Sequence, residues 1–151
     1  MDTRTFLGLE PTHNRFRWKL PVTSGICTGG DFMFGGAGLG AALAAMEGTS
    51  GRETIWATAQ YLSFARPGEY VDIDVTLAVE GHQMTQARAV CHVADREILT
   101  VNAALGQRDF PHEGQWEHVP PDVPRPEDCP LRMHRMDMGN TVHGRLDQRM
   151  A

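Results

Sequence analysis

The segment Glu69–Val79, EYVDIDVTLAV, decides the fold class that we expect for this chain. Val, Ile, Val, Leu and Val occupy every second position from 71 to 79, and Asp72, Asp74 and Thr76 stand between them. A hydrophobic period of two residues is typical of a β-strand with one buried face and one solvent face. We therefore expect Asp72 and Asp74 to lie on the solvent face of a sheet.

Other segments on both sides of this strand alternate in the same way. The connections between them are short: a Pro67-Gly68 pair, a single Gly81 and a polar turn at Ala94–Glu97. Short connections favour neighbouring antiparallel strands, so we expect a meander in which each strand pairs with the next. The other expected strands are 14–20 (NRFRWKL), 54–66 (TIWATAQYLSFAR), 82–94 and 98–106 (ILTVNAALG).

One segment predicts a helix, Gly36–Glu47, with the sequence GAGLGAALAAME. Its residues are nearly all small and apolar, and a helix that is apolar on every side is typical of a buried position. The expected order is one strand, a buried helix and four antiparallel strands. The sequence therefore predicts an α+β domain in which an antiparallel sheet wraps around one central helix.

Composition excludes several classes of protein. The 151 residues carry a formal net charge of −5, and the basic residues are scattered, whereas a nucleic-acid binder needs clustered Lys and Arg. Three distant cysteines and seven histidines show neither metal-ligand nor disulfide spacing, so we expect no metal. No apolar run approaches a signal peptide or the ~20 residues of a membrane span, so we expect a cytoplasmic location.

Prolines mark the expected domain boundary. Residues 111–130 contain six of them and show almost no periodicity, which is typical of an extended linker. We expect a first domain over 1–110, the linker over 111–130, and in 131–151 a tail or the start of a further domain.

Three features in this order resemble the acyl-CoA thioesterase II family: Phe34-Gly35-Gly36, the small-residue helix, and Phe64-Ala65-Arg66-Pro67-Gly68. The resemblance covers about Arg15–Gly106, and Trp116-Glu117-His118 is similar to the family's interdomain linker. It implies a hotdog fold and an acyl-CoA thioesterase, a hydrolase of lipid metabolism that needs no cofactor.

The resemblance also implies a partner for this domain. Family members are double hotdogs whose catalytic Asp, Thr and Gln lie in the second hotdog, and none of these can be placed on this chain. The first helical turn here, Gly36–Leu39, contains no acid. We therefore expect an acyl-CoA substrate, a second hotdog domain or a homo-oligomer such as a homodimer, and an acid supplied by that partner. The alternative is a non-catalytic module that binds acyl-CoA or an acyl carrier.

The candidate site lies where the helix begins. Gly36 offers a backbone N–H for an oxyanion, because the first amides of a helix lack partners and carry the positive end of its dipole. Phe34 and Gly35 are candidate substrate-binding residues beside it. The competing interpretation is that these glycines only permit close packing.

Other candidates are weaker. Asp31 could reach the helix start as a catalytic acid, although a solvated loop aspartate or a charge flanking the helix is the more usual interpretation. Thr58 and Gln60 share one strand face, which we expect to face the helix and to contact substrate, unless they are ordinary polar residues of a sheet. The Gly36–Ala41 segment also fits a loose GxGxxA nucleotide motif, but it lacks the βαβ context that this motif needs. Neither the D-x-N-x-x-H loop of hydratases nor GxSxG is present.

Overall fold

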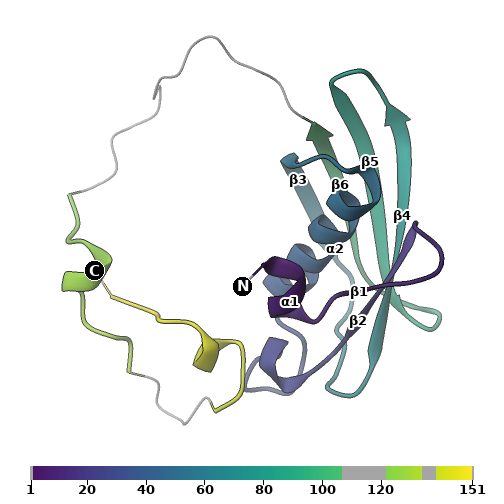
Figure 1. Ribbon diagram of the computed structural model, residues 1–151. Coiled ribbons are helices and arrows are strands. Elements are labelled where there is room, and N and C mark those ends of the chain that lie inside the picture. Colours follow the sequence, from purple (N-terminus) through teal and green to yellow (C-terminus); the bar gives the residue numbers. More distant parts are fainter. Residues whose placement is uncertain (1, 107–121, 134–138, 151) are drawn as a thin grey trace.

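The structure is a computed structural model that describes residues 2–106, 122–133 and 139–150 (Figure 1). These residues form two α-helices and six strands, and within them three short 3₁₀ turns lie outside the sheet. The helices are α1 (Thr3–Leu7) and α2 (Gly35–Ser50). The strands are β1 (Glu10–Pro11), β2 (Arg17–Pro21), β3 (Thr54–Tyr61), β4 (Tyr70–Glu80), β5 (Met84–Val93) and β6 (Arg96–Gly106). The turns are η1 (Ser24–Ile26), η2 (Pro126–Asp128) and η3 (His143–Arg145).

All six strands join one antiparallel sheet in the order β1-β2-β4-β5-β6-β3. Helix α2 packs against one face of this curved sheet and contacts β2 to β6, while α1 covers part of the helix (Figure 1). The predicted α+β architecture, with one antiparallel sheet around one helix, is confirmed. The β4–β5 and β5–β6 hairpins follow the predicted meander.

The expected partner of the 54–66 segment was wrong. Strand β3 ends at Tyr61 and pairs with β6 at the far edge of the sheet, not with β4. Residues 62–69 leave the sheet and cross near the beginning of α2. There Ala65 is buried, and its carbonyl accepts from the Met33 N–H at 2.8 Å. The turn at Gly68 exists, with φ +89°, but it links this crossing segment to β4.

The core lies between α2 and the sheet. Strands β4 and β5 supply it at every second residue, whereas β6 is buried at most of its positions. Val71, Ile73 and Val75 of β4 are buried, as their alternation predicts. Small helix residues let the sheet approach closely, because a Cβ added at Gly38 would lie 3.0 Å from Leu99 Cδ2. From α2, Ala37, Ala41, Ala42, Ala44, Ala45 and Met46 are buried, and from β5 and β6 the core takes Ala87, Ala89, Cys91, Leu99, Val101, Ala103 and Leu105.

Helix α2 is longer than the sequence predicts at both ends. It begins at Gly35, one residue earlier, and runs three residues beyond Glu47 to Ser50. Gly51 ends it in the left-handed conformation at φ +72°, a common helix stop. Near this end the indole N–H of Trp18 donates to Thr49 Oγ1 at 3.0 Å, which ties the helix to β2.

Candidate functional site

The beginning of α2 presents two backbone amides that have no acceptor among the described residues. Phe34 is extended, with φ −65° and ψ 130°, and its carbonyl accepts from the N–H groups of Ala37 and Gly38 at 2.9 and 3.2 Å. Among the described residues, no backbone carbonyl accepts from the Gly35 or Gly36 N–H. These two amides stand at the positive end of a 16-residue helix, where a developing negative charge would be stabilised.

An aromatic ring lies beside each of the two glycines. A Cβ added at Gly35 would come within 3.0 Å of Tyr61 Cε1, and the Tyr61 hydroxyl donates to the Gly35 carbonyl at 3.3 Å. A Cβ added at Gly36 would come within 2.5 Å of Phe34 Cε1. The absence of side chains at 35 and 36 therefore makes room for these rings.

Further exposed rings continue this apolar surface. Phe32 and Phe64 meet edge to face with ring centroids 6.5 Å apart. The Phe64 ring also lies beneath the guanidinium groups of Arg66 and Arg96, at 5.1 and 5.9 Å from its centroid. We call Phe32, Phe34, Tyr61 and Phe64 the aromatic rim; all four are exposed large hydrophobic residues. The rim combines apolar surface with nearby positive charge.

The predicted site residues separate into two groups. Phe34, Gly35 and Gly36 lie together at the beginning of α2. Asp31 stands four residues before the helix in an exposed turn, with φ +55°, and the first helical turn contains no acid. Its role as an acid stays a prediction.

The predicted orientation of Thr58 and Gln60 was wrong. Both side chains are exposed on the face of β3 that points away from the helix, whereas Ala57 and Ala59 pack against the core. The small alanines fit under α2, so the polar residues between them must take the outer face. Sequence alternation revealed two faces of this strand but not which one was buried.

Tyr61 is the site residue that sequence analysis missed. It shares the period-two face of Ala57 and Ala59, but the strand ends at Tyr61, so its ring projects past the sheet edge to the helix. In the sequence, the feature that could have revealed Tyr61 was its spacing of two residues from Ala59 and four from Ala57. Its contact with Gly35 depends on the placement of β3 beside β6.

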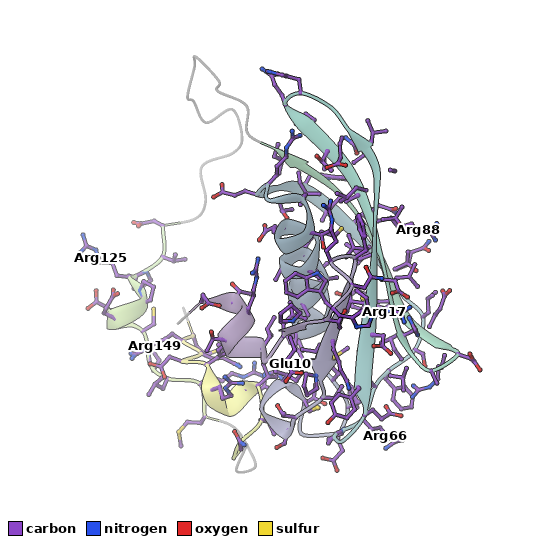
Figure 2. The ribbon with its side chains drawn as sticks, turned by 45° about the vertical axis from the view of Figure 1, so that its right-hand side comes forward. Glu10, Arg17, Arg66, Arg88, Arg125 and Arg149 are labelled. Atoms are coloured by element: carbon purple, nitrogen blue, oxygen red, sulfur yellow. The ribbon has the colours of Figure 1, made fainter. Side chains whose placement is uncertain are left out.

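A charged cluster occupies the outer face of the sheet. Asp74 accepts from Arg17 Nε at 2.6 Å and from Arg17 Nη2 at 2.9 Å, and its Oδ2 lies 3.0 Å from His92 Nε2. His92 Nδ1 lies 2.7 Å from the Ala94 carbonyl, so both ring nitrogens face acceptors. Figure 2 shows Arg17 and Arg88 on this side of the sheet, away from α2.

Electrostatics in this cluster favour the charged forms. The hydrogen bond from Arg17 lowers the pKa of Asp74, against a smaller opposing effect of burial. Burial acts to lower the pKa of His92, but the hydrogen bonds to Asp74 and Ala94 outweigh it and the pKa is raised overall. On the other side of the same strand, burial raises the pKa of Cys91 to about 12, so this thiol is a poor nucleophile.

Within the described ranges, no three His, Cys, Asp or Glu side chains gather as a metal site. No described helix is long and apolar enough to cross a membrane.

Comparisons with solved structures identify the fold. A protein from Novosphingobium aromaticivorans that carries the name thioesterase is 27% identical, with a TM-score of 0.78 over 89% of this chain and 54% of its own. The fold is a hotdog. A protein from Thermobifida fusca named as a thioesterase II is 16% identical, with a TM-score of 0.76 over 93% of this chain and 51% of its own. The chain thus spans about half the length of these two relatives.

A shorter hotdog protein offers a second comparison. A protein from Streptococcus mutans, solved with bound acetyl-CoA, is 15% identical and has a TM-score of 0.56 over 62% of this chain and 82% of its own. No protein-family profile and no curated protein matches the sequence. The chain is therefore a thioesterase-like hotdog domain by its fold.

Proposed function

We propose that this domain takes part in the hydrolysis of acyl-CoA thioesters to a free acid and CoA. The observation that carries the proposal is a pair of amides, those of Gly35 and Gly36, at the start of the central helix of a hotdog; neither has an acceptor in the part of the chain that the structure describes. The thioesterase names of two structural relatives and the acetyl-CoA bound to a third support the substrate class.

The proposed chemistry is addition of water to the thioester carbonyl. As water attacks, the carbonyl electron pair moves to oxygen, and the N–H groups of Gly35 and Gly36 together with the helix dipole stabilise the oxyanion. Collapse of the intermediate breaks the C–S bond and releases the CoA thiolate, which takes up the proton that water loses. The aromatic rim would hold the acyl chain, and Arg66 or Arg96 could contact CoA phosphates.

A water-orienting acid must come from elsewhere in the assembly, because the first turn of α2 contains none. The exposed edge of β3 is the expected contact with a second hotdog. In the described ranges this strand pairs with β6 on one side only, and Ile55, Trp56, Tyr61 and Leu62 are exposed on or next to it. An unpaired apolar edge favours strand addition, so we propose that a second hotdog, in the same polypeptide or in a second copy, pairs there.

The missing acid also favours a second candidate function. Without a carboxylate in the first turn of α2, the same glycine amides and aromatic rim would hold an acyl-CoA or an acyl carrier without turnover. If Asp31 acts as the catalytic acid, this chain hydrolyses the thioester and does not merely bind it.

The two functions separate in one experiment. This chain and any longer form are assayed for hydrolysis of acetyl-, hexanoyl- and dodecanoyl-CoA, and their binding is measured by calorimetry. We expect the chain alone to bind acyl-CoA weakly and to hydrolyse it about 10²–10⁴-fold more slowly than an assembly with the acid. Fast hydrolysis that Asp31→Asn abolishes would place the acid at Asp31, and no binding to any form would refute both functions.

A further inference from the structure

The C-terminal residues 139–146, which we call the docked segment, lie against the hotdog domain near the helix start. Figure 1 shows this yellow part of the chain beside η1. Val142 is only 3% exposed, and its N–H donates to the Cys27 carbonyl at 2.9 Å. A segment more than 100 residues away in sequence thus contributes to the packing of the loop that leads into α2.

Arg145 binds the docked segment to the hotdog domain through two further hydrogen bonds. Its guanidinium donates to the carbonyls of Gly25 and Phe6, each at 3.0 Å, and lies 4.0 Å from the centroid of the Phe6 ring. A Cβ added at Gly25 would lie 3.0 Å from Arg145 Nη1, so a glycine there makes room for this side chain. The segment therefore meets a surface shaped to receive it.

His143 connects the docked segment to the candidate site. Its ring packs edge to face on the Phe34 ring, with centroids 5.8 Å apart and an interplanar angle of 63°. Its Nδ1 lies 3.1 Å from Gln148 Nε2, which orients the imidazole. Phe34 in turn lies over Gly36. The chain of contacts runs from the docked segment through His143 and Phe34 to an amide of the proposed oxyanion site.

We propose that the docked segment is a substrate-positioning element, in which His143 holds the Phe34 ring over Gly36 and so determines which acyl groups reach the glycine amides. This inference rests on the proposed acyl-CoA site. Phe34 is 38% exposed, and a ring packed on one side only would be free to rotate away; the contact with His143 supplies a second side. His143 acts through Phe34 and is a positioning residue.

The docking itself can be tested without a ligand. Hydrogen exchange is compared among the wild-type chain, Arg145→Ala and Arg149→Ala. Arg149 is the matched control, because it also donates to a backbone carbonyl, that of Cys129, at 3.0 Å, but not to one in the hotdog domain. We expect Arg145→Ala to speed exchange in residues 139–146 and 34–38, and Arg149→Ala to leave 34–38 unchanged. Equal protection of 34–38 in all three proteins would overturn the positioning role.

The effect on substrate is tested with His143→Ala and His143→Phe. Calorimetry gives the affinities of both variants and the wild type for CoA, acetyl-CoA and dodecanoyl-CoA. We expect His143→Ala to change the ratio of the two acyl-CoA affinities by about twofold to tenfold, the range set by one aromatic pair, and His143→Phe to restore it. Affinity for CoA alone should not change. An unchanged ratio in a His143→Ala protein whose wild type binds acyl-CoA would refute this inference alone, whereas a wild type that binds none refutes the proposed function with it.

Discussion

The hydroxyl group of Tyr61 donates a hydrogen bond to the carbonyl oxygen of Gly35 across 3.3 Å. This contact joins the last residue of the edge strand β3 to the first residue of the central helix α2. The strand that we expect to pair with a second hotdog is therefore connected directly to the glycines of the candidate site. We therefore expect substitutions at the edge of β3 to alter the packing at the beginning of α2.

Removal of the Tyr61 hydroxyl tests this connection. We expect Tyr61→Phe to lower the free energy of unfolding by about 0.5–1 kcal/mol, the usual net worth of one hydrogen bond. Tyr61→Ala should cost more, because the ring that covers Gly35 is also lost. Urea unfolding of the three proteins gives the values. If Tyr61→Ala proves no less stable than Tyr61→Phe, the ring does not pack on Gly35 as described.

Substitution of Gly36 tests the space between the helix and Phe34. Alanine favours a helix over glycine by about 0.5–1 kcal/mol, so Gly→Ala within α2 should stabilise the fold unless the methyl group collides. Gly40 is the matched control, because a Cβ there would meet Leu7 Cδ1 at an ordinary 3.6 Å. We expect Gly40→Ala to raise the free energy of unfolding by about 0.5–1 kcal/mol and to leave acyl-CoA affinity unchanged.

The Gly36→Ala and Gly36→Val variants should instead push Phe34 aside and weaken acyl-CoA binding, while circular dichroism shows an intact fold. Calorimetric titration with dodecanoyl-CoA measures the affinity. A Gly36→Val protein with the affinity of the wild type would remove Gly36 from the site.

The edge of β3 predicts the state of assembly. Trp56 is 58% exposed on this edge strand, and Val79 is 57% exposed near the end of β4. We expect the chain to self-associate at high micromolar concentration, and Trp56→Lys to shift it towards monomer, because a charge on an edge strand disfavours strand addition. Val79→Lys is the control of equal exposure and should leave the light-scattering mass unchanged. A wild-type chain that stays monomeric would contradict self-association through this edge.

The cluster of Arg17, Asp74 and His92 predicts a pH dependence of stability. Because folding raises the pKa of His92, its stabilising effect is complete below the ordinary value of 6.5 and is lost as pH rises through the raised pKa. Folding lowers the pKa of Asp74, so its effect is present above 3.8 and is lost as pH falls through the lowered pKa. The cluster should stabilise most between these two values.

We therefore expect His92→Gln to destabilise the protein by about 0.5 kcal/mol at pH 5.5 and by less at pH 8.5, as is usual for partly exposed ion pairs. Urea unfolding at the two pH values measures the difference, and His82→Gln, at an exposed histidine, is the control. A loss of stability that is the same at both pH values would show that His92 contributes only by packing.

The sequence determined the elements that depend on local pattern. Alternation over 71–75 predicted which residues of β4 are buried, and the small apolar helix residues predicted α2 at the core. The expected helix start at Gly36 lies one residue after the observed start at Gly35. These features follow from residues close together in the chain, because side-chain periodicity is set by the backbone geometry of a strand or helix.

Only the tertiary structure decided what those elements touch. Strand alternation defines two faces but does not identify the neighbouring strand. Residues 62–69 cross near the start of α2 instead of forming a hairpin at Pro67-Gly68, and β3 therefore lies beside β6. That placement turned Thr58 and Gln60 outward and brought Tyr61 to Gly35. Likewise, His143 meets Phe34 across more than 100 residues. Contacts of this kind depend on which packing buries the most apolar surface in the whole domain, and no local pattern encodes that choice.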